Sequence, residues 1–586
     1  MRRKPSNEPA RPIVSRLHVV VIALGIFCVT VAIYLPAMWC EWVDYDDKAF
    51  ITKNEIVCNG LTWGGFVWAW SIHGPSQWHP LTWLSHMLDA ELFGLTPAAH
   101  HAVNVLIHSG SSVLLYALLV VTTGAPWRSA LVAAIFAWHP AHVESVAWVS
   151  ERKDVLCALF VFVTLLAYVV YVRRPSVMRY AVVVLAFALA LMSKPMAATL
   201  PVLMLLLDVW PLERFSRGRR HGMNPDAMAP VVRRALIDKL PLLAMAGAAV
   251  WLSFLCQLDA GTVSSIEDVS VQSRLTAPLV AYVRYLRLAM LPVNMSVLYP
   301  LENDPPLWQW AGSMLVLVAI TAMIIRSRRP YAVVGWLWFM ISLLPVIGIL
   351  HVGAQSIADR YTYLPYVGLS IVVSWAADEV AQWSASAKRV IVGVVATLLA
   401  LACVMVPTQL RHWRNPQTLF EQALRVTKDN DIMHFNLGRW YDDHDNVEAA
   451  VDQYAKAVEI RPGFAKAQLN LGAGLQVLGD LRQAETHLRA AIELDPELAG
   501  AHLSLGRLLA VTGRLDEAVA SLKRGIELRP AEVLGRVQLA VLFQQRGDRA
   551  QAIALVEEAL RLDPNDDLAQ AAMRDLAGPS PTATPN

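Results

Sequence analysis

Long apolar runs separated by short polar segments fill the first two thirds of the chain. A bilayer core about 30 Å thick is crossed by roughly 20 apolar helical residues, and runs of about that length recur up to residue 408. The pattern predicts eleven membrane-spanning helices. They are expected at residues 16–38, 99–122, 129–148, 155–172, 178–193, 196–212, 236–257, 307–326, 331–350, 363–380 and 389–408.

Basic residues fall at alternate ends of these spans and so give them an orientation. Arg and Lys are enriched in cytoplasmic loops, and the chain begins with the letters MRRK. We therefore expect residues 1–15 to form a basic cytoplasmic N-terminus. The loop that follows the first span, residues 39–98, is then expected to face the outer side.

Residues 275–300 do not fit this alternation as a full span. A span there would invert the orientation of everything downstream and move the basic cluster at 326–329 to the outer side. We expect this segment to be re-entrant or interfacial, with Arg284 and Arg287 reaching toward the lipid head groups.

After residue 408 the chain changes to amphipathic helices with a period of 34 residues. Prolines mark this period at Pro462, Pro496, Pro530 and Pro564. The period is that of tetratricopeptide repeats, helix pairs that bury their apolar faces by stacking on their neighbours. We expect a half repeat or connector at 409–430, four repeats at 431–566 and a disordered tail at 567–586. An odd number of spans would place the repeats on the outer side.

The predicted fold class is therefore all-α, a polytopic membrane domain over residues 16–408 followed by an α-solenoid. Composition agrees, because 55% of the 586 residues are hydrophobic and only 17% are charged. The net charge of +2 gives no overall basic field and argues against a nucleic-acid partner. Cys40 and Cys58 share the first outer loop and can pair if that loop faces an oxidising compartment.

Three carboxylates follow the first predicted span, in the stretch EWVDYDDKAF at residues 41–50. Asp44, Asp46 and Asp47 can simply be solvated side chains after a helix. Adjacent carboxylates at a membrane face can also raise each other's pKa, accept a proton from an attacking hydroxyl, or hold a divalent cation on a phosphate.

A second charged segment, HPAHVESVAWVSERKDVL at residues 139–156, follows the third predicted span. His139, His142 and Glu144 have the residue types of a zinc site, but Glu144 lies about 200° around a helix from His142. A polar cap on a helix hairpin explains the segment without function. Unpaired charge is costly near a bilayer, which favours a function for the charged cluster Glu144, Glu151, Arg152, Lys153 and Asp154. Arg152 and Lys153 can hold a lipid phosphate while the acidic residues orient them.

Other polar residues stand alone beside apolar runs. Lys194 and Arg360 are predicted on the outer side, where each can snorkel or bind an anion. His100, Asn104 and His108 recur every four residues along one helix face. Such a stripe faces a water-filled cleft or forms hydrogen bonds between helices.

Taken in order, DYDD, HPAHVESVAWVSERKDVL, ADRYTYLPYVGLS and the repeat array resemble the transmembrane-and-tetratricopeptide-repeat protein O-mannosyltransferases and their bacterial relatives. That family belongs to the GT-C glycosyltransferases. The resemblance implies transfer of a sugar from a polyprenyl-phosphate carrier on the outer face of a membrane. It also implies an active-site acidic pair, matched here by Asp46 and Asp47, and an arginine matched by Arg360.

The charged segment of the family corresponds to Glu151, Arg152 and Asp154 in this chain. One departure is Lys194, which is followed by Pro195 where the family resemblance leads us to expect a Lys-Glu pair. The role of that acid is therefore not carried over. The sugar is expected to be mannose or a similar hexose.

The expected chemistry assigns a role to each group. Asp46 or Asp47 would remove the proton of an acceptor hydroxyl as it attacks the anomeric carbon. Cations would stabilise the departing phosphate. The candidates for this second role are Arg152, Lys153, Lys194 and Arg360. No cofactor is required, because a monophosphate can leave against cations alone, although a divalent cation is compatible with the acidic loop.

The repeats are expected to present a protein or peptide acceptor. Asn436 and Asn470 occupy equivalent positions on the inner helices of successive repeats, and such a polar ladder can bond an extended backbone. Asparagine before Leu-Gly is also ordinary in these repeats, which gives the ladder a purely structural alternative.

Two other functions fit parts of the pattern. A non-catalytic membrane scaffold could use the repeats to recruit partners for envelope glycan assembly. A transporter could use the His100, Asn104 and His108 stripe as a relay, although no two-fold repeat is visible among the spans. The composition of the spans favours a bacterial inner membrane with the repeats in the periplasm.

Overall fold

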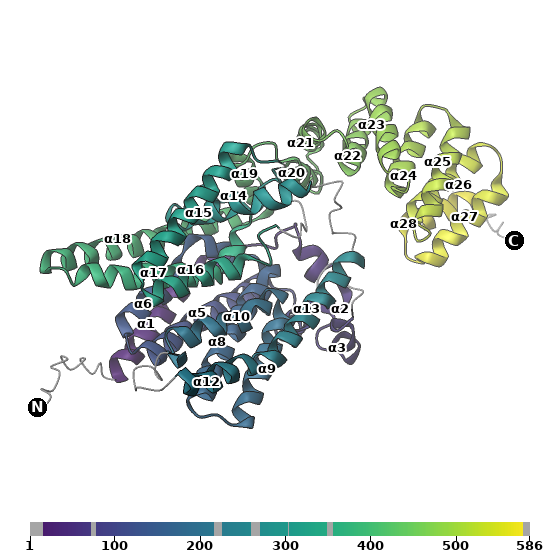
Figure 1. The fold of residues 1–586 in the computed structure, drawn as a ribbon. Helices are drawn as coiled ribbons and strands as arrows, with labels where there is room; N and C mark the ends of the chain where they lie inside the picture. The colour runs from purple at the N-terminus through teal and green to yellow at the C-terminus, as the bar shows by residue number, and fades with distance from the viewer. Residues whose placement is uncertain are drawn as a thin grey trace, which may run out of the picture. The chain divides into compact units, whose positions relative to one another are not determined.

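The computed structural model describes residues 16–71, 78–215, 225–259, 270–302, 304–348 and 355–577. Throughout these ranges the regular elements are helices, and the only β feature is an isolated bridge between Pro300 and Gln355. The predicted all-α fold is confirmed. Two compact units, Met1–Thr427 and Lys428–Asn586, divide the chain (Figure 1). The predicted basic N-terminus at 1–15 lies outside the described residues.

Among the described residues of unit 1, six helical stretches are long and apolar enough to cross a membrane. Their main helices are α1 (Arg16–Tyr34), α5 (Pro97–Thr123), α8 (Arg152–Arg173), α13 (Leu240–Asp259), α15 (Leu307–Ser327) and α18 (Ala385–Leu410). Shorter apolar helices are α9 (Val177–Ser193), α10 (Leu200–Val209) and α16 (Pro330–Leu343). A multi-pass membrane protein is therefore confirmed, whereas the count of eleven spans is not.

The predicted span 129–148 is not one helix. It forms α6 (Pro126–Trp138) and the short α7 (Val143–Ala147). The break lies at His139, whose backbone is extended with ψ near 126°, because the residue before a proline is disfavoured in the helical region. The last turns of the predicted span therefore form a separate segment, and Glu144 lies on this segment and not on α6.

The remaining helices of unit 1 are α2 (Glu55–Cys58), α3 (Trp63–Ala69), α4 (Pro80–Phe93), α12 (Pro225–Ile237), α14 (Val271–Met290), α17 (Pro365–Ala381) and α19 (Pro416–Val426). The segment predicted to be re-entrant forms most of α14, a helix of 20 residues. Its position relative to a membrane stays a prediction. Cys40 and Cys58 are both free thiols.

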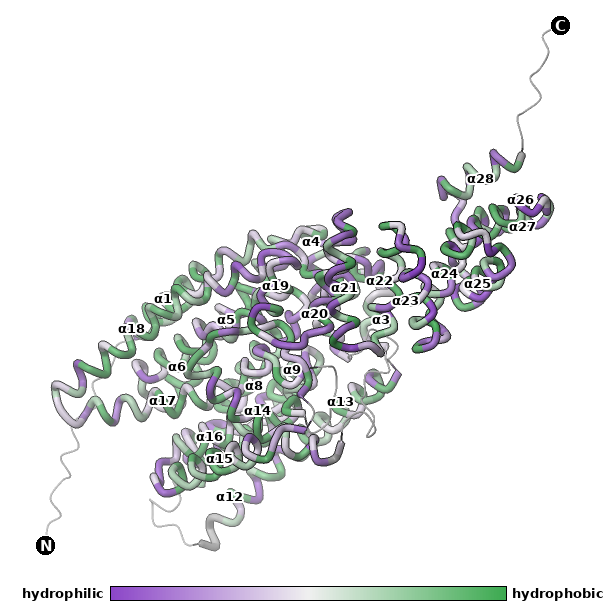
Figure 2. Tube along the Cα trace, turned by 90° about the horizontal axis from the view of Figure 1, so that it is seen from above, coloured by the Kyte–Doolittle hydropathy of each residue, from purple (hydrophilic) through white to green (hydrophobic). Residues whose placement is uncertain are grey.

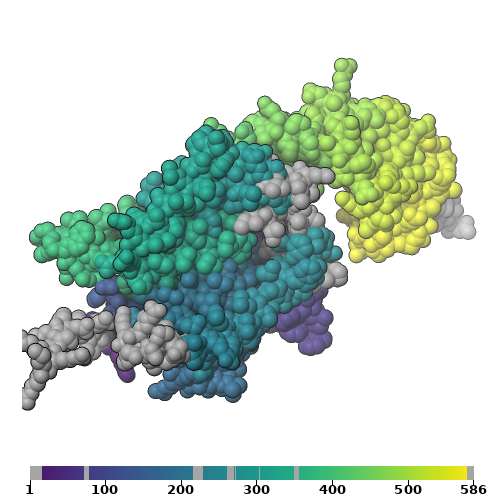
Figure 3. Space-filling model, viewed as in Figure 1, coloured from purple at the N-terminus to yellow at the C-terminus, as the bar shows by residue number. Residues whose placement is uncertain are grey.

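Apolar side chains cover much of the outside of unit 1. Green predominates along α1 and α18, which run side by side (Figure 2). The teal atoms of α15 lie on the face seen in Figure 3, and the exposed side chains of that helix include Leu315, Val318 and Ile325. Exposed aliphatic faces of this extent are expected where lipid replaces water around the helices.

Helices α16 and α17 cross at a pair of glycines. A Cβ atom added at Gly335 would lie 2.5 Å from the carbonyl oxygen of Gly368, and one added at Gly368 would lie 2.2 Å from the carbonyl oxygen of Gly335. Small residues allow membrane helices to approach this closely. The crossing fixes α17, whose first turn follows directly after the short helix that carries Arg360.

Unit 2 contains four consecutive helix pairs, as the 34-residue period predicts. They are α20 (Asp431–Asp442) with α21 (Val447–Ile460), α22 (Ala465–Val477) with α23 (Leu481–Leu494), α24 (Ala499–Val511) with α25 (Leu515–Leu528), and α26 (Val533–Gln545) with α27 (Arg549–Leu562). The alanines at 450, 484, 518 and 552 are buried. Each therefore occupies the same close crossing in its repeat.

The predicted disordered tail requires a correction over its first half. Residues Asp567–Ala577 form a further helix, α28. Ala569 and Leu576 of this helix are buried against the preceding repeat, because the exposed apolar face of a terminal repeat needs a capping helix. Residues 578–586 lie outside the described part of the chain.

Candidate functional site

The first loop of unit 1 turns Asp47 inward. Its carboxylate is fully buried and accepts hydrogen bonds from the Val43 amide at 2.8 Å, from the Ser150 amide at 3.1 Å and from the Ser150 hydroxyl. Burial raises the pKa of Asp47 to about 7, against the opposing effect of these donors. The side chain fastens the loop to the segment before α8, and both of its oxygens accept hydrogen bonds.

The neighbouring Asp46 is in a different environment from Asp47. It is partly exposed, and across the described ranges its carboxylate makes no recorded hydrogen bond or ion pair. Burial of the group raises its pKa, and nearby Lys153 lowers it. Asp44, two residues earlier, is instead paired with Lys48 one helical turn away. Of the three loop carboxylates, Asp46 is the one that has no hydrogen bond or ion pair among the described residues.

Glu151 lies at the centre of a cluster of three cations. Its carboxylate oxygens lie 3.1 Å from Lys153 Nζ, 3.4 Å from Lys194 Nζ and 3.4 Å from Arg360 Nε. We call these three basic residues the cation cluster. The cluster draws on the start of α8, the segment after α9 and the segment before α17. Lys153 and Arg360 both lower the pKa of Asp46 and Glu151 raises it, so Asp46 lies within electrostatic range of this cluster.

Two more acids hold the cluster in place. Asp154 lies 2.5 Å from Lys194 Nζ, and Glu144 pairs with Arg360 through both the guanidinium and, at 3.0 Å, the backbone amide. Burial alone would lower the pKa of Lys194 and of Arg360, but the neighbouring carboxylates raise both. Both side chains therefore stay protonated and can stabilise a departing anion.

Aromatic rings lie next to the cation cluster. The Arg360 guanidinium lies 5.4 Å from the Trp148 ring centre and 5.2 Å from that of Tyr361. The Lys153 ammonium lies 5.5 Å from the ring centre of Phe50. Rings of this kind attract cations and offer flat faces to a sugar or a prenyl chain.

Arg152 is separated from the cation cluster, although it was predicted to be part of it. Its side chain is fully buried and contacts Asp89, Asn104 Oδ1 at 2.5 Å and the His100 carbonyl at 2.8 Å. Neighbouring positions at the start of a helix point about 100° apart, so Arg152 and Lys153 face different surroundings. Its guanidinium connects α8 to α4 and α5.

The candidate histidines and Asn104 form hydrogen bonds that connect different structural elements. His139 Nε2 lies 3.2 Å from the Ala289 carbonyl, and His142 Nδ1 lies 2.7 Å from that of Phe136. Asn104 contacts the Val146 carbonyl, and His108 contacts Tyr363. The stripe on α5 thus forms interhelical contacts, one of the two alternatives for it.

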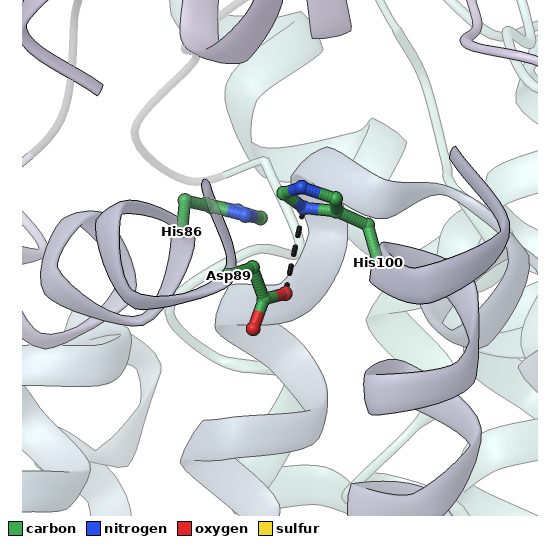
Figure 4. Close-up of side chains that lie close together, drawn as sticks. All are labelled: His86, Asp89 and His100. Carbon is green, nitrogen blue, oxygen red and sulfur yellow. Dashed lines mark ion pairs between the residues drawn. The ribbon is translucent and has the colours of Figure 1, made fainter. Parts of the chain in front are cut away.

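Sequence reasoning missed Ser150 and the polar residues of α4. His86 and Asp89 lie three residues apart on α4, and His100 of α5 faces them (Figure 4). Over the described part of the chain these three form the one group of metal-ligand type whose donor atoms lie within 4.8 Å of each other. The i, i+3 spacing of His86 and Asp89 is the available signal, within the segment 39–98 that the sequence predicts as an outer loop.

Asn436 and Asn470 lie on α20 and α22 of unit 2, the first buried and the second half-buried. They recur at equivalent positions of successive repeats, as the period requires. Their part in acceptor binding stays a prediction.

Comparisons with known proteins agree with both halves of the chain. Two models described as tetratricopeptide repeat match residues 409–463 with 469–533, and residues 537–568. The curated protein "Protein O-mannosyl-transferase TMTC4" of Homo sapiens is 24% identical over 466 residues, covering 71% of this chain and 63% of that protein. "Protein O-mannosyl-transferase Tmtc1" of Drosophila melanogaster is 32% identical over 200 residues, covering 32% and 22%.

The chain spans about half to two thirds of the length of the curated relatives that match most of it. Among solved structures, "Crystal structure of MamA" is 21% identical over 25% of this chain and 87% of that chain, with a TM-score of 0.24. That score is too low to compare folds. The matches to the curated proteins confirm the family resemblance.

Proposed function

We propose that this homologue of the transmembrane-and-tetratricopeptide-repeat O-mannosyltransferases is a membrane glycosyltransferase. It transfers a sugar, mannose or a similar hexose, from a polyprenyl-phosphate donor to a protein hydroxyl on the outer face of the membrane. The observation that supports this most directly is Asp46, a partly exposed carboxylate that has no hydrogen bond or ion pair among the described residues and lies within electrostatic range of the cation cluster.

Asp46 and the cation cluster have different roles in the transfer step. The acceptor oxygen attacks the anomeric carbon, and Asp46 takes the hydroxyl proton. The bond between that carbon and the donor phosphate oxygen breaks, and its electron pair leaves with the polyprenyl phosphate. Lys153, Lys194 and Arg360 stabilise the added negative charge on the phosphate. Attack opposite the leaving group inverts the anomeric configuration.

The helix ends support an outer position for this site. Helix α18 ends beside it, because Trp413 lies 5.9 Å from Trp148, and α18 begins at the opposite end of unit 1 with Lys388 and Arg389. Basic residues also mark the far end of α8 at Arg173. By the positive-inside bias that far end is cytoplasmic, which leaves the site on the outer side.

The repeats then supply the acceptor. Helix α19 begins at the site end of unit 1, where the Glu41 amide donates to the Arg414 carbonyl at 2.8 Å, and the repeats follow it directly in sequence. Tetratricopeptide arrays bind extended or helical peptides in their curved inner surface. Asn436 and Asn470 are our candidates for contacts with the acceptor backbone.

A transfer assay tests the proposal. Purified full-length protein in lipid nanodiscs is incubated with radiolabelled polyprenyl-phosphate mannose and an envelope protein extract, and label in protein is counted. Asp46→Asn should lower the rate at least about 100-fold, the effect of removing a general base. Asp44→Asn is the matched control, because it removes a carboxylate of the same loop that is paired with Lys48, and it should retain nearly the wild-type rate.

Transfer by Asp46→Asn at the rate of Asp44→Asn would contradict the catalytic assignment. Repeating the assay with polyprenyl-phosphate glucose identifies the preferred hexose within the proposed donor class.

A further inference from the structure

We propose that His86, Asp89 and His100 bind a divalent transition-metal ion that ties α4 to α5. The site is separate from the transfer chemistry and does not depend on the proposed function. His86 and Asp89 come from one face of α4, and His100 comes from the first turn of α5. An ion bound by all three would therefore link the two helices. Figure 4 shows the three side chains pointing toward one another.

The spacing of the donor atoms is close to that of a metal site. All three lie within 4.8 Å of each other, and His100 Nδ1 is already 3.4 Å from an Asp89 oxygen. Four ligands at about 2.1 Å in a tetrahedron lie about 3.4 Å apart. Small side-chain rotations therefore bring all three into coordinating range.

Unpartnered nitrogens point to a missing ligand. His86 Nδ1 and His100 Nδ1 are both buried and have no hydrogen-bond partner in the described part of the chain, and both side chains are more than nine-tenths buried. His100 Nε2 lies 3.3 Å from the Gly94 carbonyl and so carries the proton of a neutral ring. The lone pair of His100 Nδ1 then faces a carboxylate oxygen, an arrangement that a bound cation stabilises.

Arg152 fits the site as an outer partner. It contacts Asp89 through Oδ2, the same oxygen that lies 3.4 Å from His100 Nδ1, so an ion here would share this carboxylate with Arg152. Carboxylate ligands of metals commonly receive such a second hydrogen bond, which fixes their orientation. Arg152 also donates to Ser85 and Asn104. The ion and Arg152 together would hold the start of α8, where Glu151 and Lys153 stand.

The donor set selects the class of ion. Two imidazole nitrogens and one carboxylate oxygen suit Zn²⁺ and other first-row divalent metals, and they suit Ca²⁺ or Mg²⁺ poorly. Three protein ligands leave a fourth position for water. The site is thus distinct in chemistry from any cation held by the loop carboxylates Asp44 and Asp46.

Metal binding is measured on the purified full-length chain after treatment with a chelator. Titration with Co²⁺ should produce the visible absorption of a tetrahedral complex at about one ion per chain, and Zn²⁺ should displace it and raise the melting temperature. His86→Gln, Asp89→Asn and His100→Gln should each weaken binding at least about tenfold.

His101→Gln is the matched control. His101 is the next residue on α5 and is equally buried, but it lies outside the group of possible metal ligands. It should bind metal as the wild type does. The proposal is overturned if wild-type protein shows neither the Co²⁺ absorption nor a Zn²⁺-dependent rise in melting temperature, an outcome that needs no folded variant. Equal binding by His100→Gln and His101→Gln would overturn it as well.

Discussion

At the residue scale, two adjacent carboxylates have different surroundings and different expected roles. Asp47 is buried under three donors, while Asp46 is partly exposed beside Lys153. The sequence identifies the two carboxylates as candidates but does not distinguish their roles, because it does not show that Ser150, more than one hundred residues away, donates hydrogen bonds to Asp47. Arg152 illustrates the same limit, since only tertiary structure reveals that Asp89 neutralises it.

The buried state of Asp47 predicts a pH-dependent stability. Its pKa is about 7 in the folded chain and about 3.9 when unfolded, so its contribution is complete below about pH 4 and is lost as the pH rises through 7. Wild-type stability should therefore fall across this window relative to Asp47→Asn, by at most about 1.4 kcal/mol per pH unit. Melting temperatures of the two proteins between pH 4 and 8 measure the difference.

Asp44→Asn serves as the comparison for that series, because it removes a partly exposed carboxylate from the same loop. Its melting temperature should follow the wild type across the whole window. A constant offset between wild type and Asp47→Asn at every pH would show that Asp47 does not change its protonation on unfolding.

At the element scale, the crossing of α16 and α17 controls the placement of Arg360. Gly368→Ala puts a methyl group against the Gly335 carbonyl, so the helices must separate. We expect a loss of about 1–3 kcal/mol in stability, together with reduced transfer, because α17 follows directly after the segment that bears Arg360. The melting temperature and the transfer rate of the full-length protein measure both effects.

Gly393→Ala on α18 controls for the substitution itself. A Cβ atom there meets nothing within 4 Å, so the change should be neutral or slightly stabilising through helix propensity. If both glycine variants melt at the wild-type temperature, close packing at Gly368 does not hold α17 in place.

Sequence periodicity predicted the repeats well and the membrane helices less well. A 34-residue period leaves little freedom, and all four helix pairs appear where expected. Apolar runs give weaker boundaries, because buried helices such as α6 look like spans until a proline such as Pro140 ends them early. Helix α4 was missed because histidine, aspartate and tryptophan interrupt its apolar face.

At the scale of the whole molecule, every proposed role requires one shared side of the membrane. Asp46, the cation cluster and the acceptor-binding repeats must all be reached from the outer compartment, whereas the basic helix ends of unit 1 must not. The proposed orientation rests on the positive-inside bias and on the end of unit 1 at which α18 finishes.

Accessibility labelling of single cysteines tests this claim most directly. In a cysteine-free chain reconstituted with one orientation, residues 44, 463 and 329 are each changed to cysteine and treated with a membrane-impermeant maleimide. We predict that positions 44 and 463, in the acidic loop and in the repeats, are labelled from the same side, and that position 329 is labelled only from the other. Labelling of 44 and 463 from opposite sides would contradict the account.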